Sequence, residues 1–199
     1  MQIIKIMEKI KSIISHSIGV KSKIIADDKL LQVVKDCVTV IVTSFKSGNK
    51  LLLCGNGGSA ADAQHLAAEF SGRFYMDRDA LPAEALHCNT SYITAVGNDY
   101  GFDAVYSRMI KGIGNKGDVL IGLSTSGNSK NIIKAFEIAK EKKMITIAFT
   151  GSGGGKLKNI SDYLINVPSE DTPRIQESHI MLGHIICQLA EEQYFGKNQ

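Results

Sequence analysis

The side chains best suited to chemistry in this chain are two histidines, a glutamate and a glutamine on two predicted helices. His65 and Glu69 are four residues apart, so they lie about 40° apart around one helix axis and can meet one ligand. Gln176 and His184 are eight residues apart on the last predicted helix, about 80° apart, which keeps both on one broad face. Together the four could bind one metal ion or transfer protons on one substrate.

Each pair also has a plainer interpretation. An isolated His/Glu pair at this spacing is often a solvated surface contact. The last helix differs, because Ile180, Leu182 and Ile186 make much of its surface apolar. A polar side chain buried there without a partner would cost about 1 to 3 kcal/mol, so Gln176 and His184 need partners.

A glycine-rich loop, GNGGS at residues 55–59, precedes the helix of the first pair. Its glycines let the backbone approach a ligand, and Ser59 can cap the helix, whose first amides favour an anion or a polar oxygen. It is not a P-loop, because no G-K-[ST] follows, and it lacks the third glycine of the dinucleotide fingerprint. Nucleotide binding therefore has little support, and a tight strand-to-helix turn is the alternative. The candidate substrate-binding residues here are Asn56, Gly57, Gly58 and Ser59.

A hydroxyl-rich loop, STSGNS at residues 124–129, also lies between an apolar run and a helical pattern. Hydroxyls around a glycine at a helix N-terminus can surround a phosphate with O–H and N–H donors, without a counter-charge that would hold the product too tightly. The loop therefore predicts a phosphate site. A helix cap without a ligand is the alternative, and a serine nucleophile is not indicated because G-x-S-x-G is absent.

Two further segments carry weaker signals. The run GSGGGK at residues 151–156 resembles a Walker sequence only superficially, because Leu157 stands where a magnesium-binding hydroxyl is required. We expect a flexible turn there. Asn98 and Asp99, in a predicted loop between Gly97 and Gly101, could bind sugar hydroxyls, with an Asx turn at a helix as the equal alternative.

The elements that must position these residues follow from hydrophobic patterning. Apolar residues at three- and four-residue steps predict two helices before residue 47. The first of them could face another subunit or fold over its own domain. Uniformly apolar runs predict strands at 51–54, 84–88, 119–123, 144–149 and 163–167. Helices are expected between them near 60–70, 94–109, 130–142 and 154–160, and a last one at 174–194. This alternation predicts a three-layer α/β/α sandwich around a five-stranded parallel sheet, with ligands at the carboxyl ends of the strands.

Composition excludes several classes of protein. The 199 residues are 44% hydrophobic and 22% charged, as in globular domains. A net charge of +3 from scattered residues argues against a nucleic-acid partner. Lysines and a glutamate interrupt the isoleucine-rich N-terminus, which argues against a signal peptide or membrane span. The four cysteines form no C-x-x-C pair, so we expect reduced thiols and a cytoplasmic protein.

Four segments, taken in order, resemble the phosphoheptose isomerase family of the sugar isomerase (SIS) fold. They are GNGGSAADAQHLAAEFSGRF, GNDYGFD, LSTSGNS and TPRIQESHIMLGHI, and the resemblance spans residues 50–191. It implies one flavodoxin-like SIS domain over 1–199, with a helical extension at 1–47 and an α/β core at 48–199. It also implies a homotetramer with sites between subunits.

The resemblance further implies the role of each site residue. The family converts sedoheptulose 7-phosphate to D-glycero-D-manno-heptose 7-phosphate, a precursor of bacterial surface heptoses. Glu69 and His184 would be the acid–base pair, and Glu69 and Gln176 would also contact the substrate. One zinc ion per subunit would be held by His65, Glu69, Gln176 and His184. The 7-phosphate would be bound by Ser124, Thr125, Ser126 and Ser129, and the sugar chain by Asn56, Gly57, Gly58, Asn98 and Asp99.

Two other functions compete with the isomerase. One is a non-catalytic SIS module that binds sugar phosphates, such as a regulator that associates with the bacterial replication initiator. Such a module needs the phosphate loop but no acid–base pair, so the presence of Glu69 and His184 argues against it. The other is a zinc hydrolase, which would leave the phosphate loop unexplained.

Overall fold

The computed structural model describes residues 2–196, and side chains from residue 5 onward. The expected domain of residues 1–199 includes Met1 and residues 197–199, which lie outside the described part. The strands are β1 (Leu51–Gly55), β2 (Ala83–Ala85), β3 (Val119–Leu123), β4 (Ile145–Thr150) and β5 (Tyr163–Asn166). The α-helices are α1 (Gln2–Ile25), α2 (Asp28–Lys46), α3 (Gly58–Ser71), α4 (Thr90–Tyr100), α5 (Val105–Ile113), α6 (Lys130–Glu141) and α7 (Thr172–Phe195).

All five strands pair in parallel, in the order β2-β1-β3-β4-β5. The chain leaves β1 toward one edge for β2 and then returns to the other side of β1 for β3. Adjacent parallel strands that continue in opposite directions open a crevice beyond their carboxyl ends, which is where such sheets bind ligands. The glycine-rich loop at residues 55–59 follows β1 and the hydroxyl-rich loop at residues 124–129 follows β3, so the topology places both loops at this crevice.

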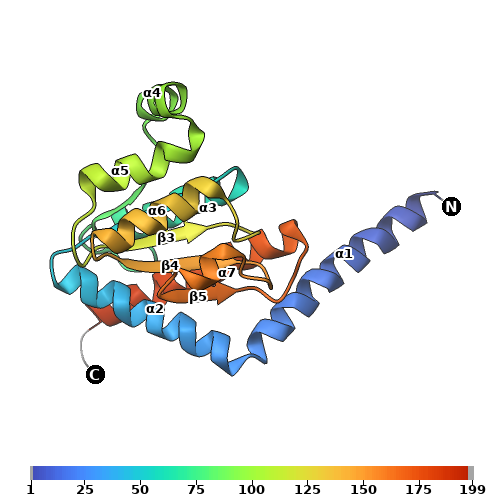
Figure 1. Ribbon diagram of the computed structural model, residues 1–199. Coiled ribbons are helices and arrows are strands. Elements are labelled where there is room, and N and C mark those ends of the chain that lie inside the picture. The colour runs from blue at the N-terminus through green and yellow to red at the C-terminus, as the bar shows by residue number, and fades with distance from the viewer. Residues whose placement is uncertain (1, 197–199) are drawn as a thin grey trace.

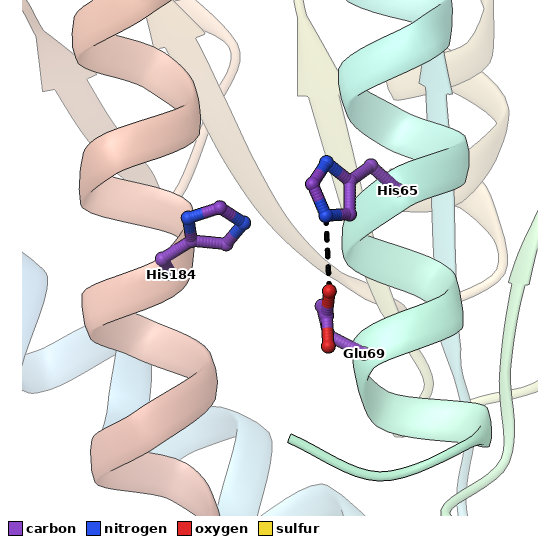
Figure 2. Close-up of side chains that lie close together, drawn as sticks. All are labelled: His65, Glu69 and His184. Atoms are coloured by element: carbon purple, nitrogen blue, oxygen red, sulfur yellow. Dashed lines mark hydrogen bonds and ion pairs between the residues drawn. The ribbon is translucent and has the colours of Figure 1, made fainter. Parts of the chain in front are cut away.

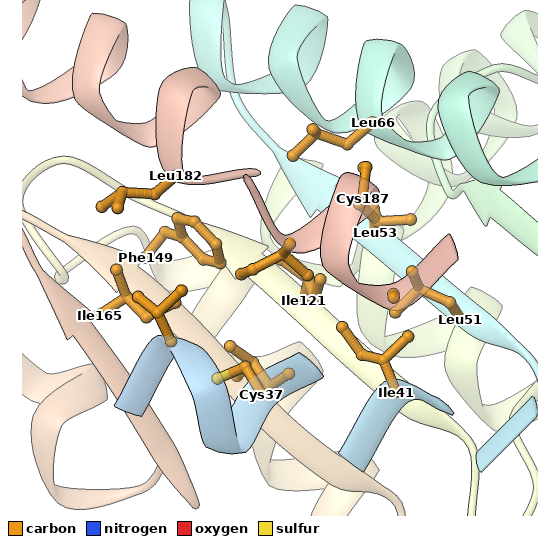
Figure 3. Packing of buried hydrophobic residues seen from close by; sticks show 14 of the residues in the cluster. Cys37, Ile41, Leu51, Leu53, Leu66, Ile121, Phe149, Ile165, Leu182 and Cys187 are labelled. Carbon is orange, nitrogen blue, oxygen red and sulfur yellow. The ribbon is translucent and has the colours of Figure 1, made fainter. Parts of the chain in front are cut away.

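Helices cover both faces of the sheet (Figure 1), and alternate residues of its central strands pack into two separate cores. Leu51 and Leu53 face the layer of α2, α3 and α7, whereas Leu52 and Cys54 face the layer of α4, α5 and α6. Figure 3 shows the first core, where Leu51, Leu53 and Ile121 of the sheet meet side chains of the helices. Burying each leucine contributes about 1.5 to 3 kcal/mol, so the two cores hold the three layers together. The predicted sandwich is confirmed.

Three expected elements differ in the structure. The helix expected over 94–109 is wrong as one element, because Gly101 adopts φ +82° and divides it into α4, the short 3-10 helix η1 (Phe102–Ala104) and α5. The strand expected at 84–88 is only the three-residue β2. The helix expected at 154–160 is only the 3-10 helix η2 (Lys156–Asn159), because Gly154 and Gly155 have φ of +70° and +54°.

The two N-terminal helices are confirmed, and α1 projects away from the rest of the molecule (Figure 1). Val20 and Ile24, near its C-terminal end, are buried against α2 and α7. Its earlier apolar side chains are about half exposed, including Ile10 at 44% and Ile14 at 54%. Most of this helix therefore does not fold over its own domain. Among the described residues, no helix combines the length and the apolar character that a membrane crossing requires.

Candidate active site

Of the four side chains singled out for chemistry, His65, Glu69 and His184 come together between α3 and α7 (Figure 2). His65 Nε2 donates to Glu69 Oε1 at 2.9 Å, and the rings of His65 and His184 meet edge to face with centroids 4.9 Å apart. One ligand atom from each of the three lies within 4.8 Å of the others. Gly183 makes this approach possible, because a Cβ there would lie 2.6 Å from the side chain of Leu66 on α3.

The electrostatics of this cluster favour a neutral His184. Burial lowers the pKa of its imidazole, the neighbouring His65 lowers it further, and only the Glu69 carboxylate opposes them. Its Nε2 is buried and has no hydrogen-bond partner among the described residues. A neutral imidazole with a free ring nitrogen beside a carboxylate and a second imidazole suits both proton transfer and zinc binding. The donor set therefore fits a zinc ion.

Gln176 lies near the start of α7, against the first loop. A Cβ on Gly58 would be 2.9 Å from both Nε2 and Oε1 of Gln176, so the glycine leaves the space that this amide occupies. Gly58 is the first residue of α3, and His65 follows two turns later. Gln176 and His65 thus mark the two ends of one stretch of the α3 surface, about 10 Å long at 1.5 Å per residue.

The first loop turns on Gly57 and is tied to the start of α6. Gly57 has φ +56° and occupies the N-cap of α3, so the expectation that Ser59 caps this helix is wrong; Ser59 is buried at its second position. The amides of Asn56 and Asn131 bond reciprocally, with Nδ2 to Oδ1 distances of 2.9 and 2.8 Å. Asn131 is 3% exposed, and its Oδ1 also accepts from the backbone N–H of Ile132. This pair bridges the crevice between β1 and β3.

The hydroxyl-rich loop is ordered by its own side chains. Ser124 Oγ and Ser129 Oγ are 2.9 Å apart, and Ser126 Oγ accepts from the backbone N–H of Asn128 at 3.2 Å. Ser129 is the N-cap of α6, and its hydroxyl makes no capping bond to that helix. Hydroxyls and the first amides of α6 are therefore presented at the carboxyl end of β3, where an anion would be stabilised.

The glycine-rich run at residues 151–156 packs against the hydroxyl-rich loop, a contact that the sequence did not indicate. A Cβ on Gly127 would overlap the carbonyl of Gly154, and Leu157 N–H donates to the carbonyl oxygen of Gly127 at 3.1 Å. The backbone N–H of Lys156 donates to Asn128 Oδ1 at 3.0 Å. The run is thus held against residues 127–128, where only glycine permits such close contact between two backbones.

Asn98 and Asp99 lie elsewhere in the chain. They belong to the last turn of α4 rather than to the expected loop, both are exposed, and Asn98 Nδ2 donates to Asp99 Oδ1 at 2.9 Å. The helix packs on η1 and α5 and stands out from the body of the domain (Figure 1). Within one chain the structure therefore does not bring them to the cluster of His65, Glu69 and His184.

Two neighbours of the cluster were not singled out from the sequence. The ring of Phe74 lies 5.7 Å from that of His184, centroid to centroid, at an interplanar angle of 35°. Asp62 precedes His65 by one turn of α3. The pKa of its carboxyl is raised, because the effect of burial outweighs the opposing effect of His65. Its Oδ2 is buried without a partner among the described residues. The periodicity of α3 could have indicated Asp62, whereas nothing local indicates Phe74.

Comparison with known proteins identifies the domain first and then the family within it. The family model described as "SIS domain" matches residues 19–151. A curated relative, the phosphoheptose isomerase of Aneurinibacillus thermoaerophilus, is 55% identical over 186 residues, which is 94% of each chain. Phosphoheptose isomerase 2 of Campylobacter jejuni is 52% identical over 188 residues, again 94% of each chain.

Solved structures agree. The phosphoheptose isomerase of Neisseria gonorrhoeae has a TM-score of 0.88 and 42% identity, covering 94% of this chain and 99% of that one. The enzyme of Francisella tularensis has a TM-score of 0.89 and 36% identity, covering 94% and 98%. The chain therefore belongs to the phosphoheptose isomerases, a family of aldose–ketose isomerases built on the SIS domain.

Proposed function

We propose that this enzyme converts sedoheptulose 7-phosphate to D-glycero-D-manno-heptose 7-phosphate, the first step toward heptose precursors of lipopolysaccharide core, capsule or surface-layer glycans. The observation that carries the proposal is the cluster of one carboxylate and two imidazoles between α3 and α7, in a chain that also presents a hydroxyl-rich loop at the carboxyl end of β3. An extended seven-carbon chain spans on the order of 10 Å, since each C–C bond is about 1.5 Å. That length suits the stretch of α3 between Gly58 and His65.

The reaction moves one proton between C1 and C2 and another between the two oxygens. A base removes a C1 proton, the electron pair forms the C1–C2 double bond, and the carbonyl oxygen takes up a proton to give an enediol. Loss of the O1 proton and return of a proton to C2 then give the aldose. We assign this work to Glu69 and His184 as a pair, because the Glu69 carboxylate can hold the carbon-bound proton and the free Nε2 of His184 can exchange a hydroxyl proton.

A zinc ion fits the same residues. His65, Glu69 and His184 would hold it, with Gln176 as the fourth ligand once its amide moves from Gly58 toward the cluster. When bound, it would polarise the carbonyl and the adjacent hydroxyl of the sugar. The remaining groups bind the substrate. Donors for the 7-phosphate are Ser124, Thr125, Ser126 and Ser129, and contacts with the sugar chain are assigned to Asn56, Gly57, Gly58, Ser59, Glu69, Gln176, Asn98 and Asp99.

We also propose a cytoplasmic homotetramer with its sites at subunit interfaces. Two features support assembly: the exposed isoleucines of α1, which no residue of the described chain covers, and the separation of Asn98 and Asp99 from the cluster within one chain. The four free cysteines are consistent with a reducing compartment. Light scattering of the wild type and of Ile10→Glu tests the assembly; a monomeric wild type, or an unchanged mass for the variant, would contradict it.

The activity is tested by incubating purified protein with sedoheptulose 7-phosphate and following the aldoheptose phosphate by NMR, with added zinc and after chelation. Conversion supports the isomerase, and loss of conversion on chelation supports the zinc site. A folded protein that binds the sugar phosphate without converting it would contradict the proposal and favour the regulatory module instead.

A further inference from the structure

Arg78, in the segment between α3 and β2, donates hydrogen bonds from all three nitrogens of its guanidinium group to acceptors inside the protein. Its side chain is 3% exposed. Nε donates to Glu191 Oε1 at 2.9 Å, and Nη2 donates to the backbone carbonyl of Glu69 at 2.8 Å. Nη1 donates to three further carbonyl oxygens, those of Phe70 at 2.7 Å, Gly72 at 3.1 Å and Asp79 at 2.9 Å. A cation at the end of a helix stabilises its last carbonyls, so Arg78 fixes the final turn of α3, which carries Glu69.

Glu191, on α7, completes the arrangement. It is 1% exposed, and besides Arg78 its carboxylate accepts hydrogen bonds from three consecutive backbone N–H groups. Burial raises the pKa of the carboxyl, but these backbone bonds and Arg78 outweigh burial, so the net pKa is lowered and the group stays ionised. The three donors are Phe74 at 3.1 Å, Tyr75 at 2.8 Å and Met76 at 2.9 Å.

Arg78 and Glu191 contact both helices of the catalytic cluster, α3 with Glu69 and α7 with His184. Glu191 follows His184 by seven residues, which places it within about 20° of the same face of α7. The segment that it holds includes Phe74, whose ring lies against His184. Arg78 holds the backbone of Glu69. The ion pair therefore links the turn of α3 that bears Glu69 with the helix that bears His184.

We propose that Arg78 and Glu191 are positioning residues, which set the orientation of Glu69 and of the Phe74 ring relative to His184. Stability alone does not account for such a pair, because apolar residues of similar volume often replace buried ion pairs without loss. Misplacing a catalytic group by about 1 Å can cost as much as 100-fold in rate. This inference rests on the proposed isomerase activity, so its test carries a second readout that does not depend on turnover.

The kinetic test compares Glu191→Gln with a matched control, Asp118→Asn. Asp118 is also 1% exposed and accepts from Lys50 N at 3.0 Å, Lys50 Nζ at 2.7 Å and Asn115 N at 2.8 Å. It lies just before β3, the central strand of the sheet, and these partners belong to neither α3 nor α7. Both changes remove a buried carboxylate charge without changing the size of the side chain, but only the first touches the link between α3 and α7.

We expect kcat of Glu191→Gln to fall by about 10- to 100-fold while KM stays within about twofold, because the phosphate loop is untouched. Asp118→Asn should unfold at a lower temperature yet keep the wild-type kcat. Arg78→Lys keeps the charge but cannot reach all five acceptors, so its kcat should lie between those of Glu191→Gln and the wild type. Unchanged kcat in folded Glu191→Gln, or equal losses in both carboxylate variants, would overturn the inference.

The second readout is the NMR shift of the His184 ring protons, to which the ring currents of Phe74 and His65 both contribute. Glu191→Gln should move these resonances and Asp118→Asn should not. The NMR comparison does not depend on turnover. A wild type that converts no substrate would refute the proposed function, whereas the positioning of His184 could still be tested by these shifts. Identical His184 shifts in wild type and Glu191→Gln would refute the positioning role itself.

Discussion

Replacing Asn131 by alanine tests whether the amide bridge between the two loops supports substrate binding. The change removes three hydrogen bonds of a residue that is 3% exposed: two with Asn56 and one with the backbone N–H of Ile132. Each bond contributes about 0.5 to 1.5 kcal/mol net, so we expect a loss of about 2 to 4 kcal/mol in the free energy of unfolding. For a chain of this size that loss lowers Tm by about 4 to 16 °C.

The bridge also predicts a change in binding. Asn56 and Asn131 connect the glycine loop with the first turn of α6, so releasing them should loosen both sides of the crevice. KM for the sugar phosphate should rise more than kcat falls, because the cluster of His65, Glu69 and His184 lies outside the bridge.

Denaturant unfolding and steady-state kinetics measure the two effects. The control is Asn159→Ala, at an exposed position at the end of η2, which should change stability by no more than about 0.5 kcal/mol. A loss of less than about 1 kcal/mol in Asn131→Ala, or an unchanged KM, would show that the bridge does not have this role.

Three further predictions follow from the site and from the core. Glu69→Gln should fold and bind inorganic phosphate like the wild type but lose turnover, and retained turnover in the NMR assay would remove Glu69 from the mechanism. Ser126→Ala should raise KM more than it lowers kcat, and an unchanged KM would place the phosphate elsewhere. The protein should lose stability as the pH falls from about 6.5 to about 4, because burial lowers the pKa of His179 to about 4 in the folded state and the unfolded chain binds the proton first. The loss attributable to this residue is about 3 kcal/mol at most. His179→Gln keeps a donor for the carbonyl of Thr150 and should flatten this part of the pH profile in denaturant titrations; an equally steep profile would assign the loss to other groups.

Local sequence patterns were sufficient to predict the parallel sheet and the two helices, α3 and α7, that carry the cluster. β1 and β3 are apolar and buried throughout because both of their faces are covered, and each is followed by small residues where the backbone turns into a helix. The spacing of His65 and Glu69 fixes their common face of α3, and the apolar surface around His184 shows that α7 is buried. These features depend on residues a few positions apart, which a sequence displays directly.

The rest of the site depends on contacts between distant parts of the chain. Asn56 and Asn131 are 75 residues apart and Arg78 and Glu191 are 113 apart, so no window of local sequence contains either pair. The break at Gly101 was missed because a glycine inside a helical pattern is compatible with both a helix and a turn, and the packing of α4 on η1 and α5 decides between them.

The hydrogen bonds between Asn56 and Asn131 do not respond to the charge of the ligand. A phosphate monoester loses its second proton near pH 6, so a sugar phosphate passes between a singly and a doubly charged anion close to neutral pH. The two side chains that join the loops are carboxamides, which carry no charge and do not titrate in this range. The contact between the two loops is therefore neutral, and it does not depend on which of the two anions enters.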